Sequence, residues 1–148
     1  MTKLYIAYGS NMDMDQMAYR CPQATSLGTG EVRDYRLLFK GSKSGNYATI
    51  EPQEGRVVPV LVWKITRADE ASLDRYEGCP IFYYKTELPV TVDGQLQQGL
   101  VYIMHEERRL GLPKQDYYGR IAAAYEQFGF DKGVLAKALA DTEAGLDA

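Results

Sequence analysis

The amino-acid sequence predicts an α+β fold built on a mixed, mostly antiparallel β-sheet. Strand patterns cluster in the first two-thirds of the chain and are separated by tight turns, whereas helical patterns dominate the last third. This separation favours α+β over a doubly wound architecture, in which strands and helices alternate along the chain. Compact domains cluster near ~100 to 150 residues, so we expect the 148 residues to form one domain over 1–148.

The first strand and the first helix are predicted by two short patterns near the amino terminus. An apolar run over residues 3–8 predicts a strand, which the turn residues from Gly9 onward interrupt. From Asp13 the spacing of apolar residues predicts a short amphipathic helix, which Cys21-Pro22 ends. The chain therefore enters a tight loop between its first strand and its first helix.

Three more strand patterns follow. Short ones occur within residues 27–40 and over residues 47–50. Residues 57–66 form the strongest pattern, and their apolar, β-branched composition predicts a strand that is buried on both faces. Pro59 cannot donate to a strand ladder, so it predicts a bulge or an edge near the start of that strand.

Residues 66–78 predict a helix with signals at both ends. Thr66 resembles an N-cap with Asp69 in the first turn, and Gly78 is suited to the carboxyl-terminal cap. The apolar spacing predicts a buried stripe that consists of Ala68, Ala71 or Ser72, and Tyr76.

The remaining elements are a hairpin and two helices. Asp93-Gly94 supplies the positive φ angles of a type I′ turn and predicts a hairpin between residues 82–92 and 96–104. Apolar residues at three- and four-residue spacing then predict a helix with a buried face made of Tyr118, Ile121, Ala122, Tyr125 and Phe128. Asp131 is the expected N-cap of a last helix, with Phe130 and Leu135 in the positions of a hydrophobic staple.

The composition limits the partners of the protein. With 45% hydrophobic and 25% charged residues, the chain is typical of a globular protein rather than a disordered one. Its 17 Lys and Arg and 20 Asp and Glu are interspersed and give a net charge of -3, so no basic stripe indicates nucleic acid. The sequence contains no run of roughly 18 apolar residues, and its amino terminus lacks the apolar run of a secretory signal. We therefore expect no nucleic-acid partner, no membrane association and no export.

The cysteines and the histidine limit the chemistry. Cys21 and Cys79 fall short of a disulfide framework or of metal-ligand spacing, and His105 is the only histidine. Catalysis by Cys-His or Ser-His-Asp would require His105, which lies in a charged segment typical of an exposed loop. We therefore expect a cytoplasmic protein with no metal and no other cofactor.

The first candidate site is the loop after the first strand. A glycine lets backbone approach a ligand closely, and N–H groups at the start of a helical turn can bind a carboxylate or an oxyanion. A purely structural turn would use the same residue types, so the loop alone does not establish a site. It lacks the lysine and later glycines of nucleotide-binding motifs. The residues of this loop are Tyr8, Gly9, Ser10, Asn11 and Met12.

The second candidate is Glu77, which lies in the last turn of the helix predicted over residues 66–78. The negative end of the helix dipole disfavours a charged carboxylate there. Burial would raise the pKa of Glu77 further, toward values that suit proton exchange at neutral pH. The alternative is an ordinary solvated glutamate at a helix end.

Taken together, these motifs resemble the γ-glutamylcyclotransferase-like family, which includes the AIG2-like and γ-glutamylamine cyclotransferase branches. The resemblance extends from Leu4 to about Gly129 and is carried, in order, by LYIAYGSNM, DYRLLF, ATIEP, VPVLVWKIT, LDRYEGCPIFYYK and VYIM. It implies a small mixed β-barrel flanked by helices, and a small-molecule γ-glutamyl substrate. It also implies roles for individual residues: Tyr8, Gly9, Ser10 and Asn11 hold the γ-glutamyl group, Glu77 is the catalytic acid/base, Gly78 shapes the turn beside it, and Tyr102 lies in the pocket.

The activity implied by the resemblance is an intramolecular cyclisation. The α-amine of a γ-glutamyl compound attacks its own γ-carbonyl, and 5-oxoproline and a free amine are released. One glutamate can take a proton from the attacking amine and return it to the leaving nitrogen. The loop that ends at Met12 can fold the substrate for attack and stabilise the oxyanion.

The sequence does not determine the leaving amine or the oligomeric state. The segments expected near the leaving amine are residues 41–46, 81–84 and 105–114. The tyrosines that could contact ligand are Tyr83, Tyr84, Tyr117 and Tyr118. We expect at least half of these tyrosines to serve packing. One alternative function is a non-catalytic module that binds a small carboxylate or amide on the same fold. Another is an interaction protein that docks through its last two helices.

Overall fold

The computed structural model describes residues 2–42 and 44–146. The strands in these ranges are β1 (Thr2–Ala7), β2 (Thr25–Ser42), β3 (Gly45–Thr66), β4 (Tyr83–Val92), β5 (Gln95–Met104) and β6 (Arg109–Leu110). The helices are the 3₁₀ helix η1 (Ser10–Met12) and the α-helices α1 (Met14–Arg20), α2 (Arg67–Glu77), α3 (Gln115–Phe128) and α4 (Lys132–Leu146). No helix within these ranges is long and apolar enough to cross a membrane.

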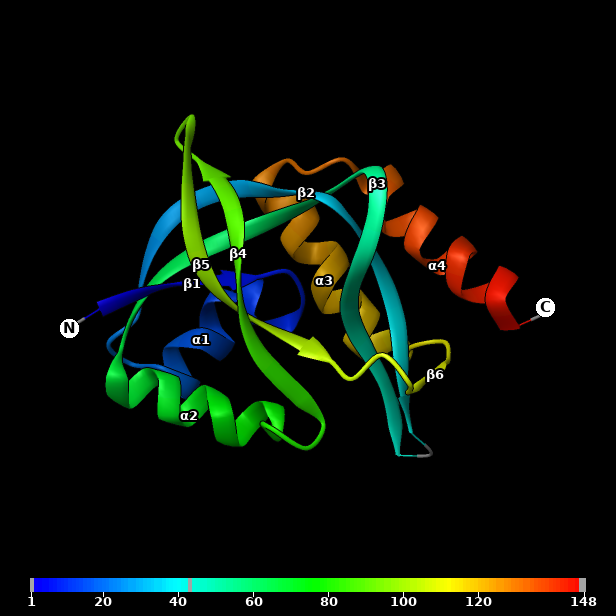
Figure 1. Cartoon of the computed structure of the whole chain (residues 1–148), viewed down its shortest axis with the longest axis horizontal. Coiled ribbons are helices and arrows are strands. Elements are labelled where there is room, and N and C mark those ends of the chain that lie inside the picture. The colour runs from blue at the N-terminus through cyan, green and yellow to red at the C-terminus, as the bar shows by residue number, and fades with distance from the viewer. Residues whose placement is uncertain (1, 43, 147–148) are drawn as a thin grey trace.

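Five strands close into a barrel, as Figure 1 shows. Their order is β3-β1-β5-β4-β2, and β2 pairs with β3 to close the ring, while β6 extends the sheet beyond β2. β1 runs parallel to β5, and the other neighbouring strands are antiparallel. This arrangement confirms the predicted α+β class and the small mixed barrel that the family resemblance implies.

β2 and β3 form one long hairpin, whereas the sequence predicted shorter, separate strands in this region. The two strands pair along nearly their whole lengths, with a register shift between Arg33 and Tyr35, where Asp34 has a φ of 65°. Residues 52–57 are mostly exposed and polar, so their composition is that of a loop, and of these residues only Pro52 and Val57 pair with β2. The strand positions were predicted correctly, but their lengths were underestimated for this reason.

The carboxyl-terminal half of β3 is buried on both faces, as predicted. Val60 and Val62 are fully buried, and Leu61 and Trp63 are at most 4% exposed. Pro59 pairs with β2, whereas the pairing of β3 with β1 begins only at Leu61. Pro59 therefore lies at an edge, which is one of the two placements expected for it.

α2 has the predicted ends but a different buried face. Thr66 and Asp69 form a capping box, and Gly78 takes the left-handed conformation that ends the helix. The predicted stripe was wrong, because Ala68, Ala71 and Tyr76 are exposed and Ser72 is only partly buried. The capping box turns Asp69 toward the protein body, and the residue four positions later, Leu73, is the buried apolar anchor.

The later elements follow their predictions. Asp93 and Gly94 have φ angles of 52° and 73° at the turn between β4 and β5. In α3 the predicted face is buried or partly buried, with Ile121 and Tyr125 fully buried. Asp131 accepts a hydrogen bond from the Gly133 N–H at 2.8 Å and so caps α4.

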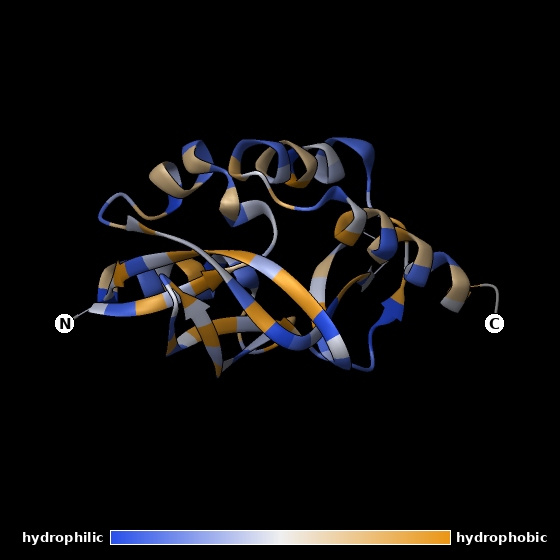
Figure 2. Cartoon of the chain, turned by 90° about the horizontal axis from the view of Figure 1, so that it is seen from above, coloured by the Kyte–Doolittle hydropathy of each residue, from blue (hydrophilic) through white to orange (hydrophobic). Residues whose placement is uncertain are grey.

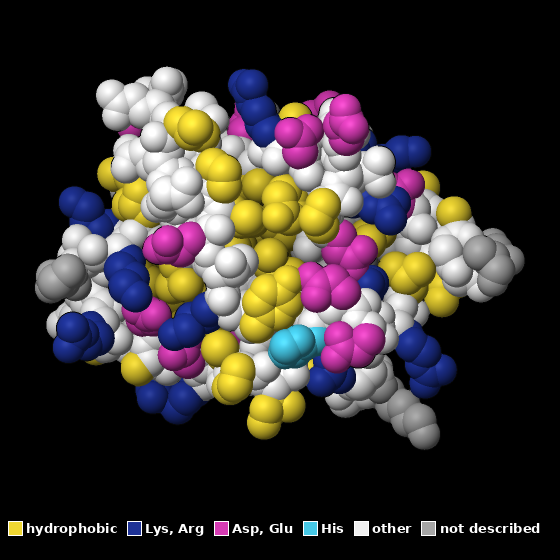
Figure 3. Space-filling model, viewed as in Figure 1, with side chains coloured by type: hydrophobic (Ala, Val, Ile, Leu, Met, Phe, Trp, Pro, Cys, Tyr) yellow, Lys and Arg dark blue, Asp and Glu magenta, His cyan; other side chains and the backbone are white. Residues whose placement is uncertain are grey.

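Most of the helical chain lies along one side of the barrel strands (Figure 2), whose apolar segments appear in orange. On the face shown in Figure 3, apolar side chains gather at the centre, and acidic and basic side chains are interspersed around them.

Candidate active site

A cavity of about 240 Å³ lies where β1 and α2 end. Tyrosine is the commonest residue type in its wall, and among residues 2–42 and 44–146 Glu77 is the only carboxylic acid there. The cavity is lined by Tyr5, Ile6, Tyr8, Gly9, Ser10, Asn11, Tyr47, Ala48, Tyr76, Glu77, Phe82, Tyr83, Tyr102 and Tyr117. The fold thus brings the two candidate sites, the loop after β1 and the end of α2, to one cavity.

The loop after β1 is buried and offers unused backbone donors. Ser10 and Asn11 are 9% and 3% exposed. The turn is closed by hydrogen bonds from Met12 N–H to Gly9 O, at 3.1 Å, and from Asp13 N–H to Ser10 O, at 3.0 Å. In the described chain, the turn, cap and loop hydrogen bonds do not use the N–H groups of Ser10 and Asn11. The first N–H groups of a helical turn have no partner within it, so these two are free to bind an anion or an oxyanion.

Asn11 fixes the loop through both its side chain and its backbone. Its Nδ2 donates to the Tyr5 hydroxyl at 2.9 Å, and its carbonyl oxygen accepts from Trp63 Nε1 at 3.1 Å. Its Oδ1 accepts a hydrogen bond from Arg20, whose guanidinium also lies 3.4 Å above the centre of the Tyr76 ring. Arg20 therefore joins the loop to the last turn of α2.

Glu77 is the last residue of α2 and is partly buried. None of the ion pairs within the described residues includes its carboxyl group. Burial raises the pKa of Glu77 to about 7, and the positive charge of Arg20 opposes part of this rise. The side chain can therefore accept and donate a proton near neutral pH.

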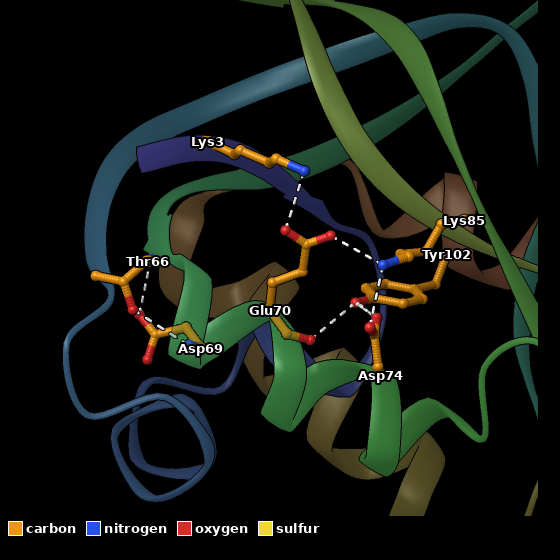
Figure 4. Close-up of polar contacts among 7 residues, drawn as sticks. All are labelled: Lys3, Thr66, Asp69, Glu70, Asp74, Lys85 and Tyr102. Atoms are coloured by element: carbon orange, nitrogen blue, oxygen red, sulfur yellow. Dashed lines mark hydrogen bonds and ion pairs between the residues drawn. The ribbon is translucent and has the colours of Figure 1, made fainter. Parts of the chain in front are cut away.

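A group of ion pairs holds α2 against the barrel (Figure 4). Glu70 lies between Lys3 of β1, at 3.1 Å, and Lys85 of β4, at 2.9 Å. Asp74 accepts from Lys85 at 3.0 Å and from the Tyr102 hydroxyl at 2.6 Å. Burial alone would raise the pKa of Glu70, but hydrogen bonds from the two lysines more than offset this and lower it. These contacts fix the helix whose last residue is Glu77.

The tyrosine hydroxyls of the wall are largely bonded within the protein. Tyr8 donates to the Tyr102 carbonyl at 2.5 Å, and Tyr83 donates to the Ala48 carbonyl at 2.8 Å. The Ala48 N–H in turn donates to the Tyr117 hydroxyl at 3.0 Å. Burial is the main reason that the pKa values of Tyr8, Tyr83 and Tyr117 are raised, so these hydroxyls stay protonated at neutral pH. Glu77 is thus the wall residue suited to proton transfer.

The structure brings together most of the residues singled out from the sequence. Tyr8, Gly9, Ser10, Asn11, Glu77 and Tyr102 all line the cavity, although the Tyr102 hydroxyl is bonded to Asp74. Met12 is fully buried in the core, and neither it nor Gly78 is a lining residue. His105 also lies outside the wall, with its Nε2 2.7 Å from the Pro80 carbonyl oxygen.

Sequence reasoning missed part of the wall. Of the four tyrosines considered, Tyr83 and Tyr117 line the cavity, whereas Tyr84 and Tyr118 do not. Of the segments expected near the leaving amine, residues 81–84 contribute Phe82 and Tyr83 to the lining. The described residues of the other two segments, 41–42, 44–46 and 105–114, contribute none. The lining residues that were not singled out as ligand contacts are Tyr5, Ile6, Tyr47, Ala48 and Tyr76. For the three tyrosines among them, the only signal in the sequence was the unusual number of tyrosines, 12 against four phenylalanines, and Ile6 and Ala48 had no such signal.

Comparisons with known proteins give one consistent answer. A family model described as "Gamma-glutamyl cyclotransferase, AIG2-like" matches residues 5–120. The Bos taurus protein named gamma-glutamylcyclotransferase is 33% identical over 103 residues, which are 65% of this chain and 53% of that protein. The Homo sapiens protein of the same name is 34% identical over 82 residues, which are 51% of this chain and 44% of that protein. The chain spans about half the length of these relatives.

A solved structure named gamma-glutamyl cyclotransferase has a similar fold. It matches with a TM-score of 0.84 at 26% sequence identity, and the match covers 93% of this chain and 86% of that one.

Proposed function

Because the chain belongs to the gamma-glutamyl cyclotransferase, AIG2-like family, we propose that it releases 5-oxoproline and a free amine from a γ-glutamyl amino acid or a γ-glutamylamine. Glu77 acts as general acid and base, and the loop after β1 holds the γ-glutamyl group. The observation that carries this proposal is the position of Glu77, which has a pKa of about 7 and lies in the same cavity as the unpaired N–H groups of Ser10 and Asn11.

The reaction needs no group from outside the substrate except a proton carrier. The α-amine arrives as an ammonium, and the Glu77 carboxylate removes one proton from it. The amine then attacks the γ-carbonyl, a C–N bond closes the five-membered ring, and the carbonyl oxygen becomes an oxyanion. When the bond to the leaving nitrogen breaks, the carboxyl group returns the proton to that nitrogen. The carboxylate then takes the second proton of the ring nitrogen and passes it to the departing amine, which leaves as an ammonium. The protein is unchanged at the end, and no water is consumed.

The loop supplies the electrostatic part of this mechanism. The N–H groups of Ser10 and Asn11 are placed to bind the α-carboxylate of the substrate or the developing oxyanion. The hydrogen bonds of Asn11 with Tyr5, Arg20 and Trp63 hold the loop before the substrate binds. A donor held in advance needs no reorganisation during the reaction, which makes it more effective.

The test is detection of 5-oxoproline by mass spectrometry after incubation with γ-glutamyl amino acids, γ-glutamylamines and glutathione. We expect Glu77→Gln to fold and to bind the same compound, but to lose roughly 10²- to 10⁴-fold in kcat, because it keeps the shape and removes proton transfer. Glu143→Gln, on an exposed part of α4, is the matched control and should keep the wild-type rate. An unchanged kcat in Glu77→Gln would refute the role of Glu77, and binding without turnover across the whole panel would favour the binding-module alternative.

A further inference from the structure

The cavity has a closed end and an open end. At one end, Asn11 of the loop and Tyr5 of β1 are nearly inaccessible, at 3% and 4% exposed. By contrast, Tyr76 is 47% exposed and Tyr47 is 37% exposed, so these two residues mark the side that is open to solvent. The Tyr76 hydroxyl also lies 3.4 Å from Ser10 Oγ, so Tyr76 reaches from the open side to the loop. A γ-glutamyl group bound at the loop therefore has Tyr47 and Tyr76 on the side where its leaving amine can reach solvent.

Four aromatic residues, Tyr47, Tyr76, Phe82 and Tyr117, form this open end, which we call the aromatic mouth. Tyr47 packs edge-on against Tyr117, with ring centres 5.2 Å apart, and against Phe82, with ring centres 6.3 Å apart. The four residues come from β3, from α2, from the segment after α2 and from α3. An edge-to-face cluster offers ring faces and edges to a flat apolar group.

The charges around the aromatic mouth disfavour a charged leaving amine. Within the described ranges, the cavity wall includes no Lys, Arg or His side chain that could neutralise a carboxylate. Arg20 covers Tyr76 at 3.4 Å, and Arg108 covers Phe82 at 4.1 Å. Because the rings line the cavity and the guanidinium groups do not, these ring faces are turned away from the ligand. A cation in the mouth would face rings that already hold a positive charge, and a carboxylate would lie against apolar rings with no basic side chain of the described wall to pair with it.

We propose that the aromatic mouth is the subsite for the leaving amine and that it selects uncharged apolar amines, aromatic ones above all. This inference rests on the proposed cyclotransferase function, because that reaction places the leaving amine there. It distinguishes γ-glutamylamines that carry no carboxylate from γ-glutamyl amino acids, which always carry one.

Four compounds separate the possibilities. γ-Glutamylphenethylamide carries a neutral aromatic amine, γ-glutamylphenylalanine adds only a carboxylate, γ-glutamylethylamide lacks the ring, and the mono-γ-glutamyl amide of 1,5-diaminopentane carries a cation. We expect kcat/KM for the phenethylamide to exceed that for the ethylamide roughly tenfold, because of the ring contacts. It should also exceed the values for the two charged compounds, since a charge placed against the rings of the mouth loses water and gains no partner.

A pair of variants assigns the preference to the aromatic mouth. Tyr47→Ala should reduce the ratio of kcat/KM for the phenethylamide to that for the ethylamide to about twofold or less. Tyr19→Ala is the matched control, because Tyr19 is 90% exposed on α1 and lies outside the cavity wall. The preference should be unchanged in that variant.

The outcomes distinguish this inference from the proposed function. If 5-oxoproline is released in a Glu77-dependent reaction but the ethylamide or a charged compound is the preferred substrate, the proposed subsite is wrong and the proposed function still holds. If no compound is turned over, the function fails, and calorimetric titration of the wild-type protein decides the subsite. Roughly tenfold tighter binding of the phenethylamide than of the ethylamide would then support the aromatic mouth, and equal binding would overturn it.

Discussion

Replacing Arg20 by methionine should shift the pH dependence of the proposed reaction toward higher pH. In the proposed mechanism the free enzyme must carry an ionised Glu77, so kcat/KM rises with pH through the pKa of that group. Burial raises that pKa to about 7, and the positive charge of Arg20 holds it below the value that burial alone would give. Without the guanidinium the pKa of Glu77 rises, so the acidic limb of the kcat/KM profile moves to higher pH.

The size of the shift follows from the electrostatic attraction between Arg20 and the ionised Glu77. Two opposite charges at a separation of roughly 8 Å interact by about 2 kcal/mol at an effective dielectric constant of about 20. Arg20 is partly exposed, and solvent reduces this interaction. We therefore expect a displacement of about one pH unit, which corresponds to about 1.4 kcal/mol.

The assay is kcat/KM from about pH 5 to pH 9, with Arg20→Met, Arg20→Lys and Arg75→Met compared with the wild type. Arg20→Lys keeps the charge and should leave the acidic limb near its wild-type position. Arg75 lies on the exposed side of α2 and donates to Ser72 at 3.3 Å, so Arg75→Met removes the same charge away from the cavity. An acidic limb of Arg20→Met that coincides with that of Arg75→Met would refute the electrostatic role of Arg20.

Two further perturbations test the same cavity. Glu77→Gln should increase the free energy of unfolding near pH 8 by up to about 3 kcal/mol, because the folded state raises the carboxyl pKa from 4.5 to about 7 and so disfavours the charged form. The folded state binds this proton more tightly than the unfolded state, so the gain in the free energy of unfolding must shrink as pH falls through 7 and disappear near 4.5. Urea unfolding that shows an equal gain at about pH 8 and about pH 4.5 would contradict the raised pKa of Glu77. Gly9→Val should abolish ligand binding in titration calorimetry, and Gly9→Ala should weaken it less. A Cβ at Gly9 would already lie 3.4 Å from the Ala48 Cβ and from the Tyr117 hydroxyl, and the methyl groups of valine would extend beyond that Cβ. Full binding by a folded Gly9→Val protein would mean that the loop is only a turn.

The features predicted correctly from the sequence depend on neighbouring residues. The turn at Asp93-Gly94 requires two positive φ angles, and the capping box of Thr66 and Asp69 lies within one helical turn. The loop at Gly9 and the end of α2 at Glu77 were also singled out from local patterns, and the structure brings both to one cavity. Because chemistry within a few residues determines these features, the sequence alone could identify them.

The features that were missed depend on contacts between distant segments. The buried face of α2 is set by Leu73 and by the inward turn of Asp69, and the apolar spacing of the helix gave no indication of either. The aromatic mouth joins Tyr47 to Tyr117, 70 positions later, only because the long hairpin and α3 meet. A tyrosine in a sequence looks the same whether it packs in a core or lines a cavity, so no pattern could separate Tyr83 from Tyr84.

Arg20 shows how such distant contacts couple position to charge in this cavity. Its guanidinium both donates to Asn11 and covers Tyr76, so the group that moderates the pKa of Glu77 also ties the loop to α2. A displacement of the loop would carry the positive charge of Arg20 away from the Glu77 carboxyl group and so raise the pKa of Glu77. The same displacement would move the N–H groups that stabilise the oxyanion out of place. Lysine retains the charge but lacks the planar fork that bonds Asn11 while stacking on a ring. Arg20→Lys should therefore raise KM while the acidic limb stays in place, and that combination separates the positional role of Arg20 from its electrostatic one.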